Sequence, residues 1–197
     1  MMADDRYPPH ARPSAATHRY DGAAIALHWL TALLIVANLI LGLSMVQLPI
    51  SPRKLHWYLW HKSIGVTVFL ATSLRLGWRT LRPPPPPLPM PRWQRRAARV
   101  SHVALYVLLA AIPVSGWLYS SATGVQVVYL GMIPLPDLVP KDKALGDALR
   151  IVHIALNSLL FAVVCIHAGA ALKHQFLDRD GALARMLPRF RSHEGVH

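Results

Sequence analysis

The stretch that most constrains the fold runs over residues 23–46 and contains no charged side chain. A helix of roughly 20 apolar residues is needed to cross the hydrocarbon core of a bilayer, which is about 30 Å thick. Three later stretches are also long and apolar enough. The predicted spans lie near residues 23–46, 57–78, 100–121 and 148–176. We therefore predict an all-α fold, an integral membrane four-helix bundle.

The composition agrees with a surface that faces lipid. Only 15% of the residues are charged and 53% are hydrophobic, whereas a soluble domain averages about 25% charged residues. The single cysteine, Cys165, excludes a disulfide framework and cannot supply the thiolates of an iron–sulfur cluster. No Cys-x-x-Cys-His sequence is present, so covalent attachment of a c-type haem is excluded as well.

Lysine and arginine predict the orientation of the spans. Fourteen of these residues fall in the N-terminal tail, the Pro-rich loop and the C-terminal segment, and six fall on the opposite side. Since cytoplasmic flanks carry the excess of basic residues, both termini are predicted to be cytoplasmic. Topology and anionic lipid then explain the net charge of +12 without a nucleic-acid partner.

The domain organisation follows from these spans. We expect a disordered cytoplasmic tail over residues 1–20, a membrane domain over 21–188 and a second cytoplasmic tail over 189–197. The N-terminal tail contains acidic residues and prolines and is not a secretory signal. The loop over residues 122–144 is too short and broken to span, so it lies at the interface or folds back over the bundle.

Five histidines lie inside apolar spans, at positions His28, His61, His102, His153 and His167. A histidine inside a membrane helix is costly unless it is partnered, and it commonly marks a functional site. The alternative for any one of them is a hydrogen bond to a neighbouring helix. That alternative explains five such residues together poorly.

Helix direction pairs four of the five histidines. His153 and His167 are 14 residues apart on the last span, which is about 21 Å of helical rise and nearly a whole number of turns. They therefore point to nearly the same face at opposite depths. Near the cytoplasmic surface His28 can face His167, and near the outer surface His61 can face His153.

The ligand set favours haem. Imidazole suits zinc, copper and haem iron, but two histidines from separate helices, without cysteine or carboxylate, match the two axial positions of a haem. The sequence therefore predicts two non-covalent b-type haems. The cations that can pair with haem propionates are Arg53, Lys54 and Lys62 on the outer side and Arg75 and Arg99 on the inner side.

Several stretches resemble the bacterial cytochrome b561 family of four-helix membrane cytochromes with two haems b. They are ALHWLTALLI around His28, WHKSIGVTVFLATSLRLGWR around His61, SHVALYVLLAAIPVSGW around His102, and the segment from VHIALNSLLF to GALARMLP around His153 and His167. The resemblance covers roughly residues 20–188. It implies that His28 with His167, and His61 with His153, are the haem ligand pairs.

The resemblance also implies an oxidoreductase of the bacterial inner membrane that passes electrons from periplasmic superoxide to ubiquinone. Arg53, Lys54 and Lys62 are the candidates for steering the superoxide anion. His174, two turns beyond His167, and His102 are the candidates for binding the quinone. Alternatively, His174 is an interfacial histidine that contacts lipid headgroups or a haem propionate. The alternative for His102 is that it orients the inner haem.

Two other functions fit the same residues. The first is an electron-carrier subunit that anchors a hydrogenase, a dehydrogenase or another soluble redox protein, because a basic outer surface attracts an acidic partner as well as superoxide. The second is a haem-binding sensor whose output is the Pro-rich loop. No signalling domain supports the sensor.

Overall fold

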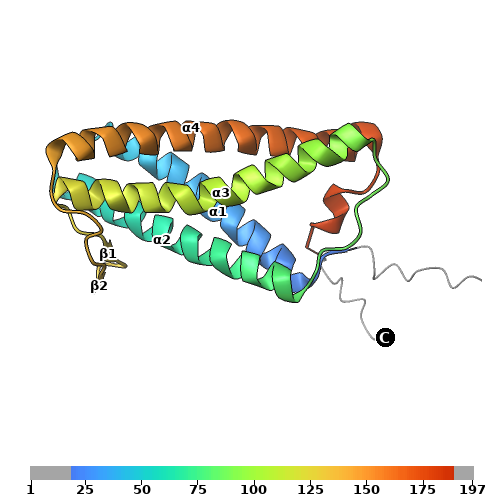
Figure 1. The fold of residues 1–197 in the computed structure, drawn as a ribbon, viewed down its shortest axis with the longest axis horizontal. Coiled ribbons are helices and arrows are strands. Elements are labelled where there is room, and N and C mark those ends of the chain that lie inside the picture. The colour runs from blue at the N-terminus through green and yellow to red at the C-terminus, as the bar shows by residue number, and fades with distance from the viewer. Residues whose placement is uncertain (1–18, 189–197) are drawn as a thin grey trace, which may run out of the picture.

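The computed structural model describes residues 19–188, which form four long helices, with a small hairpin in the connection between the third and the fourth (Figure 1). The helices are α1 (Gly22–Met45), α2 (Pro52–Leu81), α3 (Arg92–Thr123) and α4 (Lys143–Lys173). The smaller elements are the strands β1 (Val128–Tyr129) and β2 (Ile133–Pro134), a π-helical turn (His174–Asp178) and a 3-10 turn (Leu183–Arg185). The predicted all-α four-helix bundle is confirmed.

Local sequence signals explain where the helices begin and end. Asp21, Ser51 and Asp142 precede α1, α2 and α4, and each side chain accepts a hydrogen bond from the backbone N–H three residues later. Such capping satisfies an N–H group that has no partner inside the helix. Gly124 ends α3 in the left-handed conformation, with φ of 72°, which glycine adopts without steric cost.

The outward faces of the helices are apolar. Leu33 on α1 and Phe161 on α4 expose 67% and 60% of their surface. Among the described helices, α1, α3 and the continuous stretch Lys143–Asp178 are long and apolar enough to cross a membrane. α2 is long enough but is not among these helices, because Lys62 and Arg75 lower its hydropathy, so the predicted span near residues 57–78 is less apolar than expected. Exposed apolar helices of this length are typical of a membrane protein.

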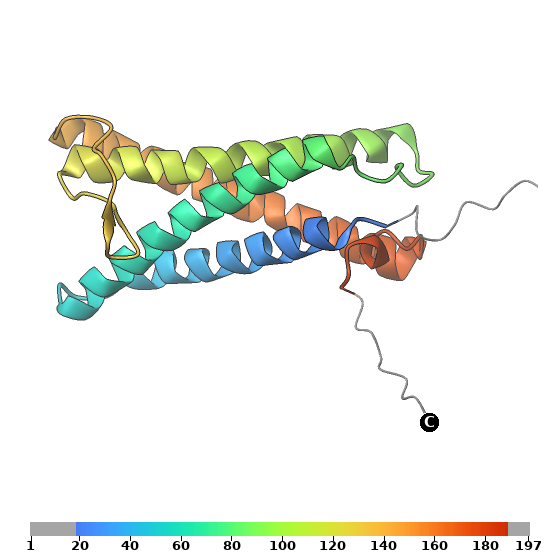
Figure 2. The same cartoon turned by 90° about the horizontal axis from the view of Figure 1, so that it is seen from below.

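The helices pack mainly as two pairs. α3 lies along α4 and α1 along α2, and the contact between α2 and α3 joins the pairs (Figure 2). The buried centre of the bundle consists of Val68, Leu108, Leu109, Ile112 and Leu160. This small core lies between the level of His61 and His153 and the level of His28 and His167. It fixes the relative positions of the helices that carry these histidines.

One end of the bundle, called here the termini end, gathers both ends of the described chain. The Arg19 guanidinium donates to the Leu187 carbonyl (2.6 Å), and the Trp29 indole donates to the Met186 carbonyl (2.7 Å). Arg19 is therefore hydrogen-bonded, although the sequence predicts a disordered tail over residues 1–20. The rest of that tail, and the tail over 189–197, lie outside the described residues.

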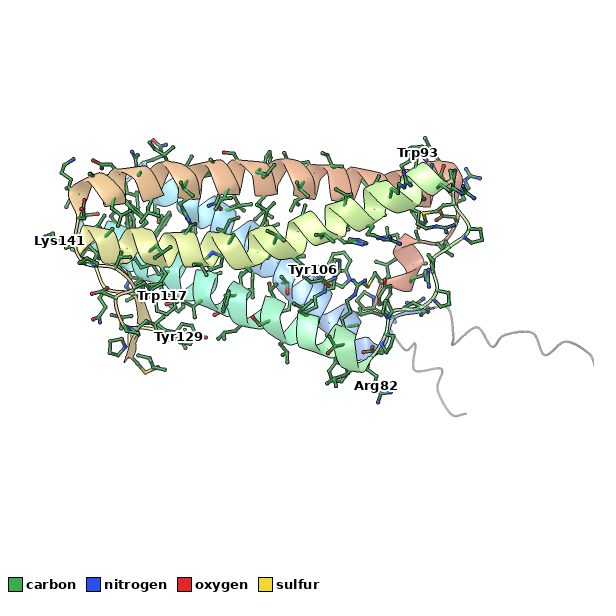
Figure 3. The ribbon with its side chains drawn as sticks, viewed as in Figure 1. Arg82, Trp93, Tyr106, Trp117, Tyr129 and Lys141 are labelled. Atoms are coloured by element: carbon green, nitrogen blue, oxygen red, sulfur yellow. The ribbon has the colours of Figure 1, made fainter. Side chains whose placement is uncertain are left out.

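The other end, called here the hairpin end, is covered by the loop between α3 and α4. The backbone N–H of Leu130 donates to Ser63 Oγ (3.0 Å), and Thr67 Oγ1 lies 3.3 Å from the Tyr129 hydroxyl. Trp117 and Tyr129 lie at this end, whereas Trp93 lies at the termini end (Figure 3). The loop thus folds back on α2, which is one of its two expected arrangements.

Candidate functional site

Two histidines face each other near the hairpin end. The ring centres of His61 on α2 and His153 on α4 are 6.3 Å apart, and the rings are nearly perpendicular. Each residue lies about two and a half turns into its helix, so the two helices bring the rings to the same depth. The structure therefore brings together the residues that the sequence pairs on the outer side.

A second pair lies near the termini end. The ring centres of His28 on α1 and His167 on α4 are 6.4 Å apart, almost the same separation as in the first pair. Because His153 and His167 share α4, one helix contributes a histidine to each pair. The two pairs therefore lie one above the other along the bundle, as the 14-residue interval predicts.

The spacing of both pairs fits a metal ion between the two rings. Two imidazoles on opposite sides of one metal ion, each bonded at about 2 Å, have ring centres roughly 6 Å apart. The observed separations of 6.3 and 6.4 Å match this arrangement. Direct hydrogen bonding between the two rings would bring them closer. The residues present therefore fit a group whose iron takes two axial imidazoles, and b-type haem is such a group.

A cavity of about 300 Å³ opens between the helices at the hairpin-end pair. Its lining is mainly apolar and includes Asn38, His61, Gly65, Pro113, Gly116 and His153. The side-chain oxygen of Asn38 is buried without a hydrogen-bond partner among the described residues. An apolar cavity with a few polar atoms is typical of a cofactor site, so this space can accept a flat, mostly apolar macrocycle.

The hydrogen bonds of the rings differ between positions. Ser115 Oγ lies 2.9 Å from Nδ1 of His153, whereas Nδ1 of His28 and Nδ1 of His61 are buried without a partner of good geometry in the described part of the chain. Metal-bound histidine commonly donates its other ring N–H to a neighbouring group. Ser115 is thus a site residue that the sequence analysis missed, because a serine in an apolar helix carries no signal of its own.

A third histidine lies beside the termini-end pair. The ring centre of His102 on α3 is 5.4 Å from that of His167. Arg75 and Arg79 on α2 lie over the ring of Tyr106, at 5.5 and 6.0 Å from its centre, and Tyr106 lies between α3 and α2 in Figure 3. This end of the bundle therefore combines three imidazoles with two guanidinium groups, which can balance acidic substituents of a cofactor.

His174 lies apart from both pairs, in the π-helical turn that follows α4. Its Nδ1 is 2.6 Å from Asp180 Oδ2 and 3.1 Å from Asp178 Oδ2. The other oxygen of Asp180 accepts the backbone N–H of Ala182 at 2.9 Å, which fixes the carboxylate. The ring of His174 is therefore held by a carboxylate at the termini end, an arrangement suited to proton transfer.

The three basic residues predicted to steer an anion all lie at the hairpin end. Arg53 is exposed at the start of α2. The Lys54 ammonium donates to the Leu48 carbonyl (2.7 Å), and the Lys62 ammonium donates to the Val125 carbonyl (3.1 Å). Lys62 also lines the cavity. Lys62 is thus the closest of the three to the histidine pair along α2, and Arg53 is the most exposed.

A bundle of apolar helices with opposed histidines defines a class, the membrane proteins that bind haem between helices. The chain belongs to the prokaryotic cytochrome b561 family, whose family model matches residues 19–189. The match spans all four helices. The family binds haem b and transfers electrons, so the chain is a membrane cytochrome of this type.

Individual relatives agree with the family. The chain is 37% identical to "Cytochrome b561 homolog 2" of Escherichia coli (strain K12), over 90% of this chain and 96% of the relative. It is 29% identical to "Probable superoxide oxidase CybB" of Yersinia pestis, over 88% of this chain and 98% of the relative. "Cytochrome b561 homolog 1" of Escherichia coli (strain K12) is also 29% identical, over 87% and 98%.

Proposed function

We propose that the protein is a di-haem b cytochrome of the bacterial inner membrane that carries electrons from periplasmic superoxide to ubiquinone. His61 and His153 hold one haem near the hairpin end, and His28 and His167 hold the other near the termini end. The observation that carries the proposal is the spacing of the two pairs, 6.3 and 6.4 Å between ring centres. When bound, each haem would accept and donate one electron, at two different depths of the bundle.

The protein's own residues place these carriers. α4 provides one histidine at each depth that would hold a haem, and about 21 Å of helical rise separates the two. α2 and α1 provide the opposite ligands, and the core around Val68 and Ile112 keeps water from the space between the sites. The bundle thereby defines a path from the hairpin end to the termini end.

At the hairpin end the substrate is an anionic radical. Superoxide gives up one electron and leaves as dioxygen, so the protein has to attract a small anion and release a neutral molecule. The positive charges of Arg53, Lys54 and Lys62 favour the encounter. The similarity to a relative named as a probable superoxide oxidase supports this donor. The hairpin end therefore faces the periplasm in our proposal, and both termini face the cytoplasm.

At the termini end two electrons and two protons convert ubiquinone to ubiquinol, so two superoxide ions are consumed per quinone. His174 is held by Asp180 at 2.6 Å, and this dyad is suited to donating a hydrogen bond to a quinone carbonyl and passing it a proton. His102 lies nearer to the histidine pair and is the second candidate. We assign the main proton-donating role to His174, because Asp180 holds its ring through Nδ1 and leaves Nε2 to face the quinone.

The experiment that tests this function is a reduction assay on the purified protein in detergent or liposomes. Superoxide produced enzymatically should reduce the haems and then added ubiquinone, and superoxide dismutase should abolish both reactions. If the haems stay oxidised under superoxide but are reduced by a soluble protein fraction from the same cells, the protein is an electron-carrier subunit and superoxide is not the donor.

A further inference from the structure

Two glycines occupy corresponding positions against the histidines of the hairpin-end pair. A Cβ atom added to Gly42 on α1 would lie 3.0 Å from Cε1 and 3.4 Å from Nδ1 of His61. A Cβ atom added to Gly116 on α3 would lie at the same two distances from Cε1 and Nδ1 of His153. Each imidazole therefore fills the space that a side chain on the adjacent helix would otherwise need.

The position of each glycine also matters for a backbone carbonyl one helical turn earlier. The carbonyl of Asn38 lies four residues before Gly42 on α1, and that of Ile112 lies four residues before Gly116 on α3. Side chains in a helix lean toward its N-terminus, so a side chain at position i+4 covers the surface of residue i. Glycine at positions 42 and 116 therefore leaves these two carbonyls accessible from the neighbouring helix.

Other helical glycines do not show this feature. An added Cβ at Gly22, Gly77 or Gly169 would meet no heavy atom within 4 Å. Gly42 and Gly116, in contrast, contact histidine rings from two different helix pairs at matching distances. Within residues 19–188, the glycine contact with a histidine ring thus occurs at the hairpin-end pair and not at His28 or His167.

We propose that Gly42 and Gly116 are positioning residues of the hairpin-end haem, an inference that rests on the proposed haem-binding function. Each glycine admits a histidine ring against its helix and lets Nδ1 face a backbone carbonyl, which directs Nε2 into the cavity. A metal-bound histidine whose other nitrogen faces a carbonyl is fixed in orientation and tautomer. The two glycines therefore act on the iron through His61 and His153 without touching it.

The two positions differ in how firmly the ring is otherwise held. Nδ1 of His153 also has Ser115 Oγ at 2.9 Å, whereas Nδ1 of His61 has no partner of good geometry among the described residues. The orientation of His61 therefore depends more on Gly42. A larger side chain should consequently disturb the site more at position 42 than at position 116.

The test uses graded substitutions on the full-length protein purified with its haems. In Gly42→Ala and Gly116→Ala the ring has to move by a few tenths of an ångström, so the reduction potential and the low-spin electron paramagnetic resonance signal of one haem should change. In Gly42→Val the hairpin-end site should bind haem about 10- to 100-fold more weakly, as when groups that orient a metal ligand are lost. Gly77→Ala and Gly77→Val are the matched controls, and neither should change the haem content or either signal.

The second haem reports on folding in every variant, since the termini-end pair contains no such glycine. The proposal is overturned if Gly42→Ala, Gly116→Ala and Gly42→Val retain both haems with unchanged potentials and signals. It is also overturned if both haems change equally, because the effect would then be a general one on the bundle. The variant His61→Ala shows whether the glycine proposal or the proposed function is at fault. If His61→Ala leaves the haem content unchanged, the assignment of His61 as a haem ligand is wrong.

Discussion

The hydroxyl oxygen of Ser115 on α3 lies 2.9 Å from Nδ1 of His153 on α4. Ser115 donates its own proton to the carbonyl of Ile112 at 2.8 Å, so its oxygen is left to accept from the imidazole. This assigns the proton of His153 to Nδ1 and leaves Nε2 free to bind a metal. The serine therefore fixes the state in which His153 can serve as a ligand.

Replacing Ser115 by alanine should raise the reduction potential of the hairpin-end haem. A histidine that donates its Nδ1 proton to an acceptor is a more basic ligand and favours the oxidised iron, so loss of the acceptor favours the reduced state. Haem affinity at this site should also fall, by about tenfold or more. Potentiometric titration followed by absorbance measures the shift.

Two variants control for the Ser115→Ala experiment. Ser115→Thr keeps an acceptor oxygen and should restore the original potential. Ser158→Ala removes an exposed hydroxyl that donates to Ile154 on the outside of α4, and it should leave both haems unchanged. A Ser115→Ala protein with the original potential at the hairpin-end haem would show that the hydrogen bond does not tune the ligand.

Replacing Arg53 by glutamate should slow the reduction of the haems by superoxide, by about tenfold at low salt. The substitution reverses a charge at the exposed start of α2, and steering of an anion depends on such charges. The effect should shrink as salt is raised, because exposed charges are screened. Rapid-mixing absorbance at several ionic strengths gives the rate. Arg82→Glu, at the opposite end of the bundle (Figure 3), should leave it unchanged.

Replacing His174 by alanine should slow electron transfer to ubiquinone while leaving reduction of the haems by superoxide intact. The ring is held by Asp180 at 2.6 Å, so Asp180→Asn should have a weaker effect in the same direction. Gln175→Ala, on the same turn, serves as the control. If His174→Ala reduces ubiquinone as fast as the unchanged protein, the quinone does not bind at His174. Slower ubiquinone reduction in His102→Ala would then support His102, the second candidate.

Replacing Asp21 by alanine should destabilise the bundle by about 1 kcal/mol near neutral pH, the usual cost of losing a helix cap. Asp21 accepts the backbone N–H of Ala24 (2.9 Å) and the indole N–H of Trp78 (3.0 Å). The hydrogen bond from Ala24, followed by the one from Trp78, lowers the pKa of this carboxyl below its ordinary value of 3.8.

The sign of the pH dependence follows from that shift. A carboxyl with a lowered pKa in the folded state stabilises the fold above its ordinary pKa and loses this effect as the pH falls through the folded value. The difference between Asp21→Ala and the unchanged protein should therefore narrow in acid. Thermal unfolding in detergent, followed by circular dichroism near pH 7 and near pH 3, measures it. A difference that widens in acid would contradict the assignment.

Much of the fold was predictable because membrane helices depend on local composition. The uncharged stretch over residues 23–46 corresponds to α1, and the alternation of helix direction places His28 with His167 and His61 with His153. These inferences need only helix rise, turn angle and order along the chain. Helix caps such as Ser51 extend α2 beyond its apolar segment, which hydropathy alone does not reveal.

Other features depend on how the helices cross, which one sequence does not specify. Gly42 and Gly116 resemble any small residues of a membrane helix until α2 and α4 place a histidine ring against each of them. Ser115 becomes significant only through its distance to His153. The engagement of Lys62 with the carbonyl of Val125 likewise depends on the loop folding back over α2.

The haem content of single histidine variants tests the central claim most directly. The purified protein should contain two b-type haems per chain, and His61→Ala or His153→Ala should each lose the same one, identified by its potential and its paramagnetic resonance signal. His28→Ala and His167→Ala should each lose the other, and His56→Ala should lose neither. Retention of both haems in His61→Ala and His153→Ala, or loss of the same haem in His61→Ala and His28→Ala, would contradict the two-site account.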